Sequence, residues 1–138
     1  MKVFLDTNIL LDVLLDRKSF SEPSSKVWRL AECGRLEAVI SAISFNNIFY
    51  IVRKYSGKEA AQRTVEVMNV NFSVFPLTQD IIGRAIAAKL PDFEDSIQFF
   101  SAVSCEADYI ITRNAKDFPQ DSIPVLSPAA FLGLKDLS

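Results

Sequence analysis

The distribution of apolar and polar residues along the chain predicts short buried strands that alternate with amphipathic helices. Short apolar runs are typical of strands that a sheet buries on both faces. We expect strands at Lys2–Leu5, Val39–Ile40, Phe72–Phe75, Tyr109–Ile111 and Val125–Leu126. Longer stretches with apolar residues three or four positions apart predict helices. We expect helices at Ile9–Leu15, Ser21–Gly34, Ser44–Tyr55, Lys58–Asn69, Thr78–Leu90, Asp92–Glu106 and Pro128–Leu132.

This alternation predicts the α/β class, because strand–helix–strand units form parallel sheets through right-handed crossovers. We expect four or five short parallel strands flanked by helices, in a single domain of residues 1–138. Thr78 and Ser44 are suited to begin two of the helices as N-caps. Sites in such sheets form at the carboxyl ends of the strands. The polar residues that follow each strand are therefore the candidates for function.

The composition narrows the chemistry that is available to this chain. It contains no histidine, which excludes Ser-His-Asp and Cys-His catalysis and argues against a zinc site. Cys33 and Cys105 both lie in apolar stretches, and we expect both to be buried and reduced. A net charge of -2 and a pI of about 5.1 argue against binding nucleic acid through bulk positive charge. Any contact with RNA must then come from local basic groups.

We expect no targeting segment in the N-terminal residues. Asp6 and Asp12 interrupt the apolar stretch before a signal peptide could form, and no apolar run approaches the length needed to span a membrane. We therefore expect a cytoplasmic protein without a membrane partner.

The first candidate motif is Asp6-Thr7-Asn8, which directly follows the first strand. Asp6 at a strand end suits a hard cation such as Mg²⁺, which takes oxygen ligands on a rigid frame. Thr7 and Asn8 would then contact substrate. The alternative is that Asp6 or Thr7 caps the helix that follows.

The second motif brings two carboxylates together at the start of a helix. Asp92 and Asp95 lie three residues apart and so share one helix face. Clustered carboxylates raise each other's pKa unless a cation neutralises them, as in metal sites before loading. The alternative is a structural one, with Asp92 as N-cap and Asp95 in the first turn favouring the helix dipole.

The third and fourth motifs supply uncharged and basic groups. Thr112, Arg113 and Asn114 follow a strand, and Asp117 lies just beyond them. Asn114 and Asp117 would face a metal, while Arg113 would bind phosphate or form a surface ion pair with Asp117. An ordinary polar loop is the alternative. In the helix after the second strand, Asn46 or Asn47 should face a polar cavity, because a buried amide needs partners. Arg53, Lys54 and Lys58 form a second basic cluster, which a solvated helix end explains equally well.

In their order along the chain these motifs resemble the PIN-domain family, best known from the toxin ribonucleases of toxin–antitoxin pairs. Leu5–Asn8 is similar to the family's opening motif, and Asp95–Ile97 to its Asp-Ala-Ile helix start. Ile111–Asn114, followed by Asp117 and Phe118, is similar to Thr-Arg-Asp followed by Asp-Phe. The resemblance implies a PIN-like fold of three layers with a central parallel sheet.

The chain departs from the family at two acidic positions. Ser41–Asn47 lies where the family has a helix that carries a Glu, and that acid falls on Asn47 here. The Asp of Thr-Arg-Asp falls on Asn114. The loss of two charges should weaken the binding of a hard cation, although Asp92 and Asp117 are nearby carboxylates that could compensate.

The leading hypothesis is a Mg²⁺- or Mn²⁺-dependent endoribonuclease, which the resemblance implies. Asp6 and Asp95 would hold the metal, which activates water for attack on a phosphodiester. Asn47, Asn114 and Asp117 would orient the water molecules bound to the metal. The implied partners are RNA, an antitoxin protein and a second copy of the chain. The sequence leaves the RNA target, the antitoxin and the oligomeric state open.

Other functions remain open on the sequence. A degenerate module that binds RNA or protein without catalysis is the main alternative, motivated by the two Asn positions. A phosphatase with Asp6 as nucleophile would need an acid where Asn8 stands. A phospho-accepting receiver domain would need a paired acid near the start of the chain. Both of these rest on analogy of fold alone.

Overall fold

Five parallel strands form one sheet in the order β3-β2-β1-β4-β5 in the computed structural model, which describes residues 1–134. The last four residues of the expected domain lie outside the described residues. The strands are β1 (Lys2–Leu5), β2 (Glu37–Ser41), β3 (Ser73–Phe75), β4 (Tyr109–Ile111) and β5 (Val125–Leu126). The helices are α1 (Thr7–Leu14), α2 (Ser21–Glu32), α3 (Ala42–Ser56), α4 (Lys58–Asn71), α5 (Gln79–Ala88), α6 (Phe93–Ser104) and α7 (Pro128–Leu132). The predicted α/β class and parallel sheet are confirmed.

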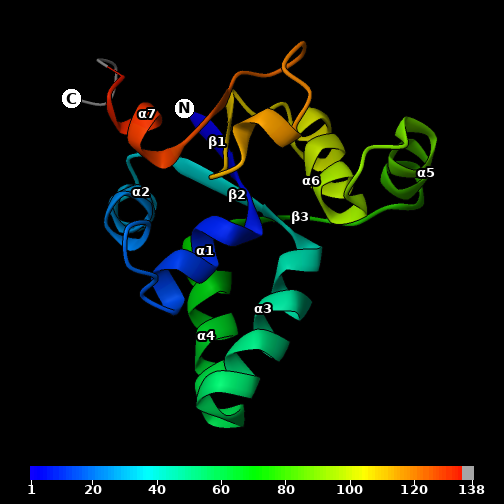
Figure 1. Cartoon of the computed structure of the whole chain (residues 1–138). Coiled ribbons are helices and arrows are strands. Elements are labelled where there is room, and N and C mark those ends of the chain that lie inside the picture. Colours follow the sequence, from blue (N-terminus) through cyan, green and yellow to red (C-terminus); the bar gives the residue numbers. More distant parts are fainter. Residues whose placement is uncertain (135–138) are drawn as a thin grey trace.

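Helices cover both faces of the sheet, which makes the predicted three layers (Figure 1). Val3 and Leu5 of β1 are fully buried in a core that also contains residues of α1, α2, α3, α4 and α7. Phe4 points to the opposite face, because side chains alternate along a strand, and joins a second core with Phe99 of α6. Burial on both faces explains why β1 is apolar at three consecutive positions.

Several predicted details differ from the structure. The first helix begins at Thr7 rather than Ile9, with Asp6 at its N-cap position. Ser41 caps α3, accepting a hydrogen bond from the backbone N–H of Ile43, so Ser44 is not the cap. The expected cap of α5 by Thr78 is confirmed.

Two further differences concern the exposure of a cysteine and the loop after β4. Both cysteines are free as expected, but only Cys105 is buried, whereas Cys33 is exposed just after α2. A short 3₁₀ helix, Ala115–Asp117, forms in the loop after β4, where no element was expected.

The strand order brings the motif that follows the first strand next to the motif that follows β4, although the two are far apart in the sequence. β1 lies between β2 and β4, and the backbone N–H of Asp6 donates to the carbonyl oxygen of Ile111 at 3.0 Å. The residues that follow β1 and β4 therefore meet at one edge of the sheet. Among the helices of residues 1–134, none has the length and hydropathy of a membrane span.

Candidate active site

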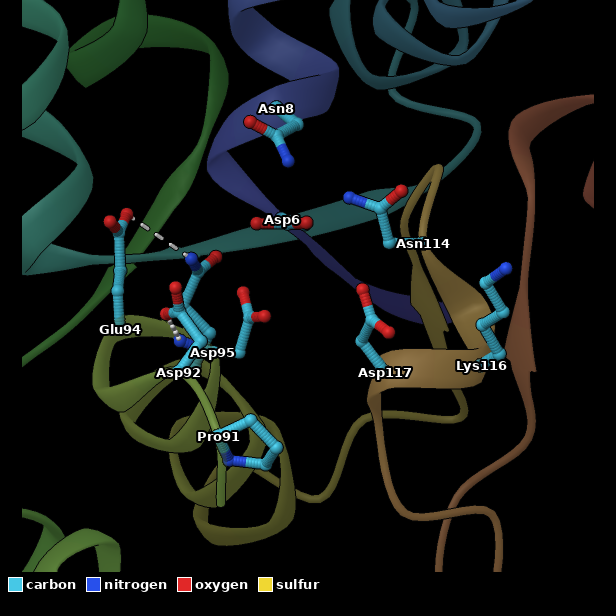
Figure 2. Close-up of a pocket in the computed structure, with 10 residues that line it drawn as sticks. Asp6, Asn8, Pro91, Asp92, Glu94, Asp95, Asn114, Lys116 and Asp117 are labelled. Atoms are coloured by element: carbon cyan, nitrogen blue, oxygen red, sulfur yellow. Dashed lines mark hydrogen bonds between the residues drawn. The ribbon is translucent and has the colours of Figure 1, made fainter.

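A cleft of about 530 Å³ opens at the carboxyl edge of the sheet. Its described lining combines five carboxylates with three amides and a single lysine. The residues that line it are Asp6, Asn8, Pro91, Asp92, Glu94, Asp95, Gln98, Asn114, Lys116 and Asp117. Figure 2 shows the carboxylates of α6 on one side, Asn114 and Asp117 on the other, and Asp6 between them. The structure thus brings Asp6, Asp95 and Asn114 to one cleft.

The α6 side of the cleft is organised by the start of the helix. Asp92 is the N-cap, and its Oδ1 accepts a hydrogen bond from the backbone N–H of Asp95 at 2.9 Å. The structural interpretation of Asp92 is therefore correct, although Asp92 also lines the cleft. Because the helix begins here, the side chains of Glu94 and Asp95 leave its first turn toward the cleft (Figure 2).

Asp6 is held at the base of the cleft by uncharged donors. Its side chain is almost completely buried, with 2% of its surface exposed. The hydroxyl of Thr112 donates to Asp6 Oδ2 at 2.7 Å and accepts the backbone N–H of Asn114 at 3.1 Å. Burial raises the pKa of Asp6, and the hydrogen bonds from Thr112 and Gln98 oppose that rise. Thr112 is therefore a buried support for Asp6 rather than a group at the cleft surface.

The pKa of Asp95 shows most clearly that negative charges are crowded in this cleft. Burial raises its pKa, and the nearby carboxylates of Asp6, Asp92, Glu94 and Asp117 raise it further, to about 7. All the dominant influences on Asp95 disfavour its ionised form. The cleft is therefore poised to gain free energy from a positive ion, which would relieve repulsion among its carboxylates.

Glu94 is a site residue that the sequence analysis missed. Its Oε1 accepts a hydrogen bond from the side-chain amide of Asn47 at 2.9 Å and a longer one from Gln98 at 3.4 Å. Asn47 itself is not part of the cleft lining, so it supports a carboxylate rather than replacing one. α3 thus lacks the expected acid, but Glu94 on α6 supplies a negative charge. This carboxylate contacts Asn47, the position where the acid was expected.

Gln98 and Lys116 were also missed. Gln98 is buried, with 1% of its surface exposed, and its Oε1 accepts the backbone N–H of Thr7 at 3.0 Å. A polar residue four positions after Glu94, inside an apolar stretch of α6, was the available sign of its role. Lys116 is the one basic side chain in the described cleft lining and lies beyond Asp117 in Figure 2. In the sequence it lies between Asn114 and Asp117, which were both predicted to belong to the site.

Arg113 does not lie in the described lining of the cleft. Its Nε lies 2.9 Å from Oδ2 of Asp12 on α1, although the N–H is not aligned for a hydrogen bond. Its guanidinium carbon also lies 4.2 Å from the ring centre of Phe20. The alternative of an ion pair with Asp117 is therefore wrong, because the partner is a fully buried aspartate that lies 3.5 Å from Arg17 as well. Phosphate binding by Arg113 stays a prediction.

The other predicted contacts divide between surface and core. Asn8 lines the cleft, as expected for a substrate contact. Thr7 is buried, and its hydroxyl shares a 2.8 Å hydrogen bond with that of Ser44 on α3. Thr7 therefore joins α1 to α3 and does not reach the cleft surface.

The donor set fits a hard divalent cation in its chemistry. Carboxylate and amide oxygens are the ligands that Mg²⁺ and Mn²⁺ prefer. In residues 1–134, however, no three carboxylates are gathered closely enough to hold an ion without adjustment. Binding would therefore require side chains such as Glu94 and Asp117 to rotate inward, which their partly exposed positions permit.

The fold and sequence match known proteins along most of the chain. A family model described as PIN domain matches residues 2–116. Ribonuclease VapC1 of Aquifex aeolicus strain VF5 is 25% identical over 135 residues, which cover 94% of this chain and 92% of that protein.

Solved structures agree with this match. A chain of a toxin–antitoxin complex from Klebsiella pneumoniae is 27% identical with a TM-score of 0.69, covering 91% of this chain and 97% of the other. A chain of DNA-bound VapBC from Salmonella typhimurium is 19% identical with a TM-score of 0.72, covering 93% and 98%. The second likeness concerns the fold alone.

The family match covers most of the chain and includes Asp6, Glu94, Asp95 and Asn114. The sheet order, the acidic cleft at its carboxyl edge and this match all agree. The chain belongs to the PIN-domain family.

Proposed function

We propose that this protein is a divalent-metal-dependent endoribonuclease and that the acidic cleft is its active site. The observation that carries this proposal is the crowding of carboxylates around Asp95, which raises its pKa to about 7. Such crowding costs folding free energy in the absence of a cation, so it is expected at a metal site. The ribonuclease from Aquifex aeolicus, similar over nearly the whole chain, supports RNA as the substrate class.

The residues of the cleft would have distinct roles. Asp6, Glu94 and Asp95 would hold the metal, with Asp117 and Asp92 as further carboxylates at its edge. The bound ion would supply an activated water and stabilise the leaving oxygen of the phosphodiester.

The surrounding groups would bind and orient. Asn8 and Asn114 present amides that can donate to or accept from RNA and water, and Lys116 supplies a positive charge near the phosphate. Asn47 would orient Glu94 through the 2.9 Å hydrogen bond, and Thr112 would fix Asp6.

Both Mg²⁺ and Mn²⁺ suit this set of ligands. We propose tighter binding of Mn²⁺, because Mn²⁺ generally binds mixed nitrogen and oxygen sites better and Asn114 contributes no charge. Glu94 supplies one of the charges that the two Asn positions lack, which supports a site strong enough for catalysis.

We further propose that an antitoxin protein inhibits this nuclease and that it acts in the cytoplasm. Toxin–antitoxin complexes are among the structures that it resembles, including the one from Klebsiella pneumoniae. A second copy of the chain is a further proposed partner. Co-expression with a candidate antitoxin should relieve growth arrest and yield a stable complex on gel filtration.

The central experiment compares wild type with Asp6→Asn on mixed RNA. We expect wild type to cleave RNA with Mn²⁺ or Mg²⁺, and expect EDTA or Asp6→Asn to abolish cleavage. Circular dichroism would verify that the variant is folded. Wild-type protein that binds neither ion at millimolar concentration and leaves RNA intact would instead establish the non-catalytic binding module, which the neutral Asn114 favours.

A further inference from the structure

The solvent-exposed face of α3 combines amides, an aromatic ring and cations. α3 packs through Ser44, Ile48 and Val52, which are its buried residues. Residues that lie opposite this stripe on a helix are exposed to solvent. Tyr50 lies at the centre of that opposite face, with 63% of its surface exposed.

The residues around Tyr50 are amides and cations. Asn47, Tyr50 and Lys54 are spaced i, i+3 and i+7, so they form one line along the helix. Asn46 and Arg53 flank this line and are exposed. We refer to Asn46, Asn47, Tyr50, Arg53 and Lys54 as the α3 track.

The charge of α3 is entirely positive. The helix contains Arg53 and Lys54 but no aspartate or glutamate in its fifteen residues. In α4, by contrast, Glu59 and Glu66 accompany Lys58 and Arg63. The α3 track is therefore a local positive surface on a chain with a net charge of -2.

The α3 track begins at the active site. Asn47 donates its side-chain amide to Glu94, which lines the acidic cleft. From there α3 runs away from the sheet beside α4 (Figure 1). The rise of a helix places Lys54 about 10 Å along the axis from Asn47. A polymer that leaves the cleft over α3 would meet amides first, then an aromatic ring, and then two cations.

We propose that the α3 track binds single-stranded RNA next to the cleavage site, with Tyr50 stacking on a base and Arg53 and Lys54 contacting phosphates. This inference rests on the proposed ribonuclease function and specifies how the substrate is held. A cleft lined by five carboxylates repels RNA until a cation is bound, so a grip on the strand must lie outside it. Aromatic rings beside positive charges form the usual surface for single strands, because every base presents a face for stacking.

Stabilisation of the helix end alone does not account for the α3 track. Cations in the last turn favour the helix dipole, which explains Arg53 and Lys54 without RNA. It does not explain Tyr50, which lies three residues before Arg53 and exposes an aromatic side chain to solvent. The alternative occupant of an exposed aromatic face is a second copy of this chain, and the experiment below distinguishes it.

The experiment measures binding of a short fluorescein-labelled single-stranded RNA of mixed sequence by fluorescence anisotropy. EDTA is present, so that no cleavage occurs. We expect Tyr50→Ala to weaken binding about tenfold, the order expected when one base–aromatic stack is lost. Arg53→Gln and Lys54→Gln should each reduce the slope of log affinity against log salt by about 0.7.

Two matched variants serve as controls. Ile86→Ala removes a large apolar side chain from α5 that is 62% exposed, close to the 63% of Tyr50. Arg29→Gln removes an exposed charge on α2. Both should bind RNA like wild type. With Mn²⁺ present, Tyr50→Ala should raise KM for RNA cleavage and leave kcat nearly unchanged, because the ring does not touch the reacting atoms.

Two outcomes would overturn this proposal, and a third would contradict the ribonuclease function alone. Wild type that does not bind the RNA, or Tyr50→Ala and Lys54→Gln that bind it like wild type, would exclude the α3 track as an RNA site. Variants that change only the mass measured by light scattering would identify a second copy as the occupant. RNA that is bound through the α3 track but never cleaved with Mn²⁺ would contradict the ribonuclease function and leave this binding site standing.

Discussion

Asn47 of α3 and Glu94 of α6 are joined by a 2.9 Å hydrogen bond at the side of the acidic cleft. The family resemblance predicted an acid at position 47. Asn47 is neutral here, and it donates a hydrogen bond to the carboxylate of Glu94. An acid on α6 can serve the same cleft as an acid on α3, because the two helices meet there. The neutral residue then acquires a supporting role.

The first prediction tests this relationship. Glu94→Gln keeps the shape of the side chain and removes its charge, so divalent-metal affinity should fall by at least about tenfold. The double variant Asn47→Glu, Glu94→Gln should recover much of that loss. Isothermal titration calorimetry measures both, with the exposed Glu59→Gln on α4 as the control. Unchanged affinity in Glu94→Gln would remove Glu94 from the metal site.

The second prediction concerns the pH dependence of stability without metal. Asp95 has a pKa of about 7 in the folded protein and an ordinary value of 3.8. Between these values the unfolded chain has lost the proton that the folded protein retains, so stability falls as pH rises from about 4 to 7. Above this range the contribution of Asp95 is constant. Thermal melts in EDTA should show this decline.

The same melts contain their own control. Asp95→Asn should flatten the decline between pH 4 and 7, because the group that titrates is gone. Mn²⁺ should raise the melting temperature more at pH 8 than at pH 5, since it binds the ionised carboxylates. An equal Mn²⁺ effect at both values would contradict the assignment of Asp95 as a ligand.

The third prediction concerns the buried ion pair behind the site. Arg113→Gln removes the shorter of the two ion pairs that the structure shows for the fully buried Asp12 and leaves the longer one with Arg17. We expect a loss of about 3 kcal/mol in the free energy of unfolding, because an uncompensated charge would remain in the core. Urea denaturation measures it. Arg84→Gln breaks an exposed pair with Asp80 and should change stability by only about 0–1 kcal/mol. An Arg113→Gln variant as stable as wild type would contradict a structural role.

The fourth prediction tests whether Thr112 supports the ionised form of Asp6 or only contributes to the stability of the fold. Thr112→Val removes the hydroxyl that donates to Asp6 Oδ2 at 2.7 Å. The pKa of Asp6 should rise further, so metal affinity should fall at neutral pH and recover as pH increases. Thr64→Val on α4 removes a hydroxyl that bonds within its own helix and serves as the control. A loss of affinity that is independent of pH would contradict this account.

The sequence predicted the location of the site better than the roles of its residues. Asp6 and Asn114 follow strands directly, and parallel strands end at one edge, so their convergence could be inferred from order alone. Glu94 could not be assigned in this way, because it lies beside two other acids at a helix start where a capping interpretation was equally good. Only the contact with Asn47 distinguishes it.

Arg113 shows a different limit of the sequence. A side chain that follows a strand can point to either face of the sheet, and its neighbours Thr112 and Asn114 serve the site. Arg113 instead points toward α1, where Asp12 is buried among apolar residues. The pattern of α1 showed an aspartate in an apolar stretch but not which cation would meet it, because that partner lies about a hundred residues away.

The position of β1 in the middle of the sheet determines when the nuclease centre can arise during synthesis. Asp6 leaves the ribosome before Thr112, which supports it and follows 106 residues later. β1 can pair with β4 only after that segment has emerged, and such long-range pairing forms late in folding. A growing chain therefore carries scattered carboxylates but no assembled site. The ribosome that makes this protein is exposed to a competent nuclease only after the segment that contains β4 and Thr112 has emerged.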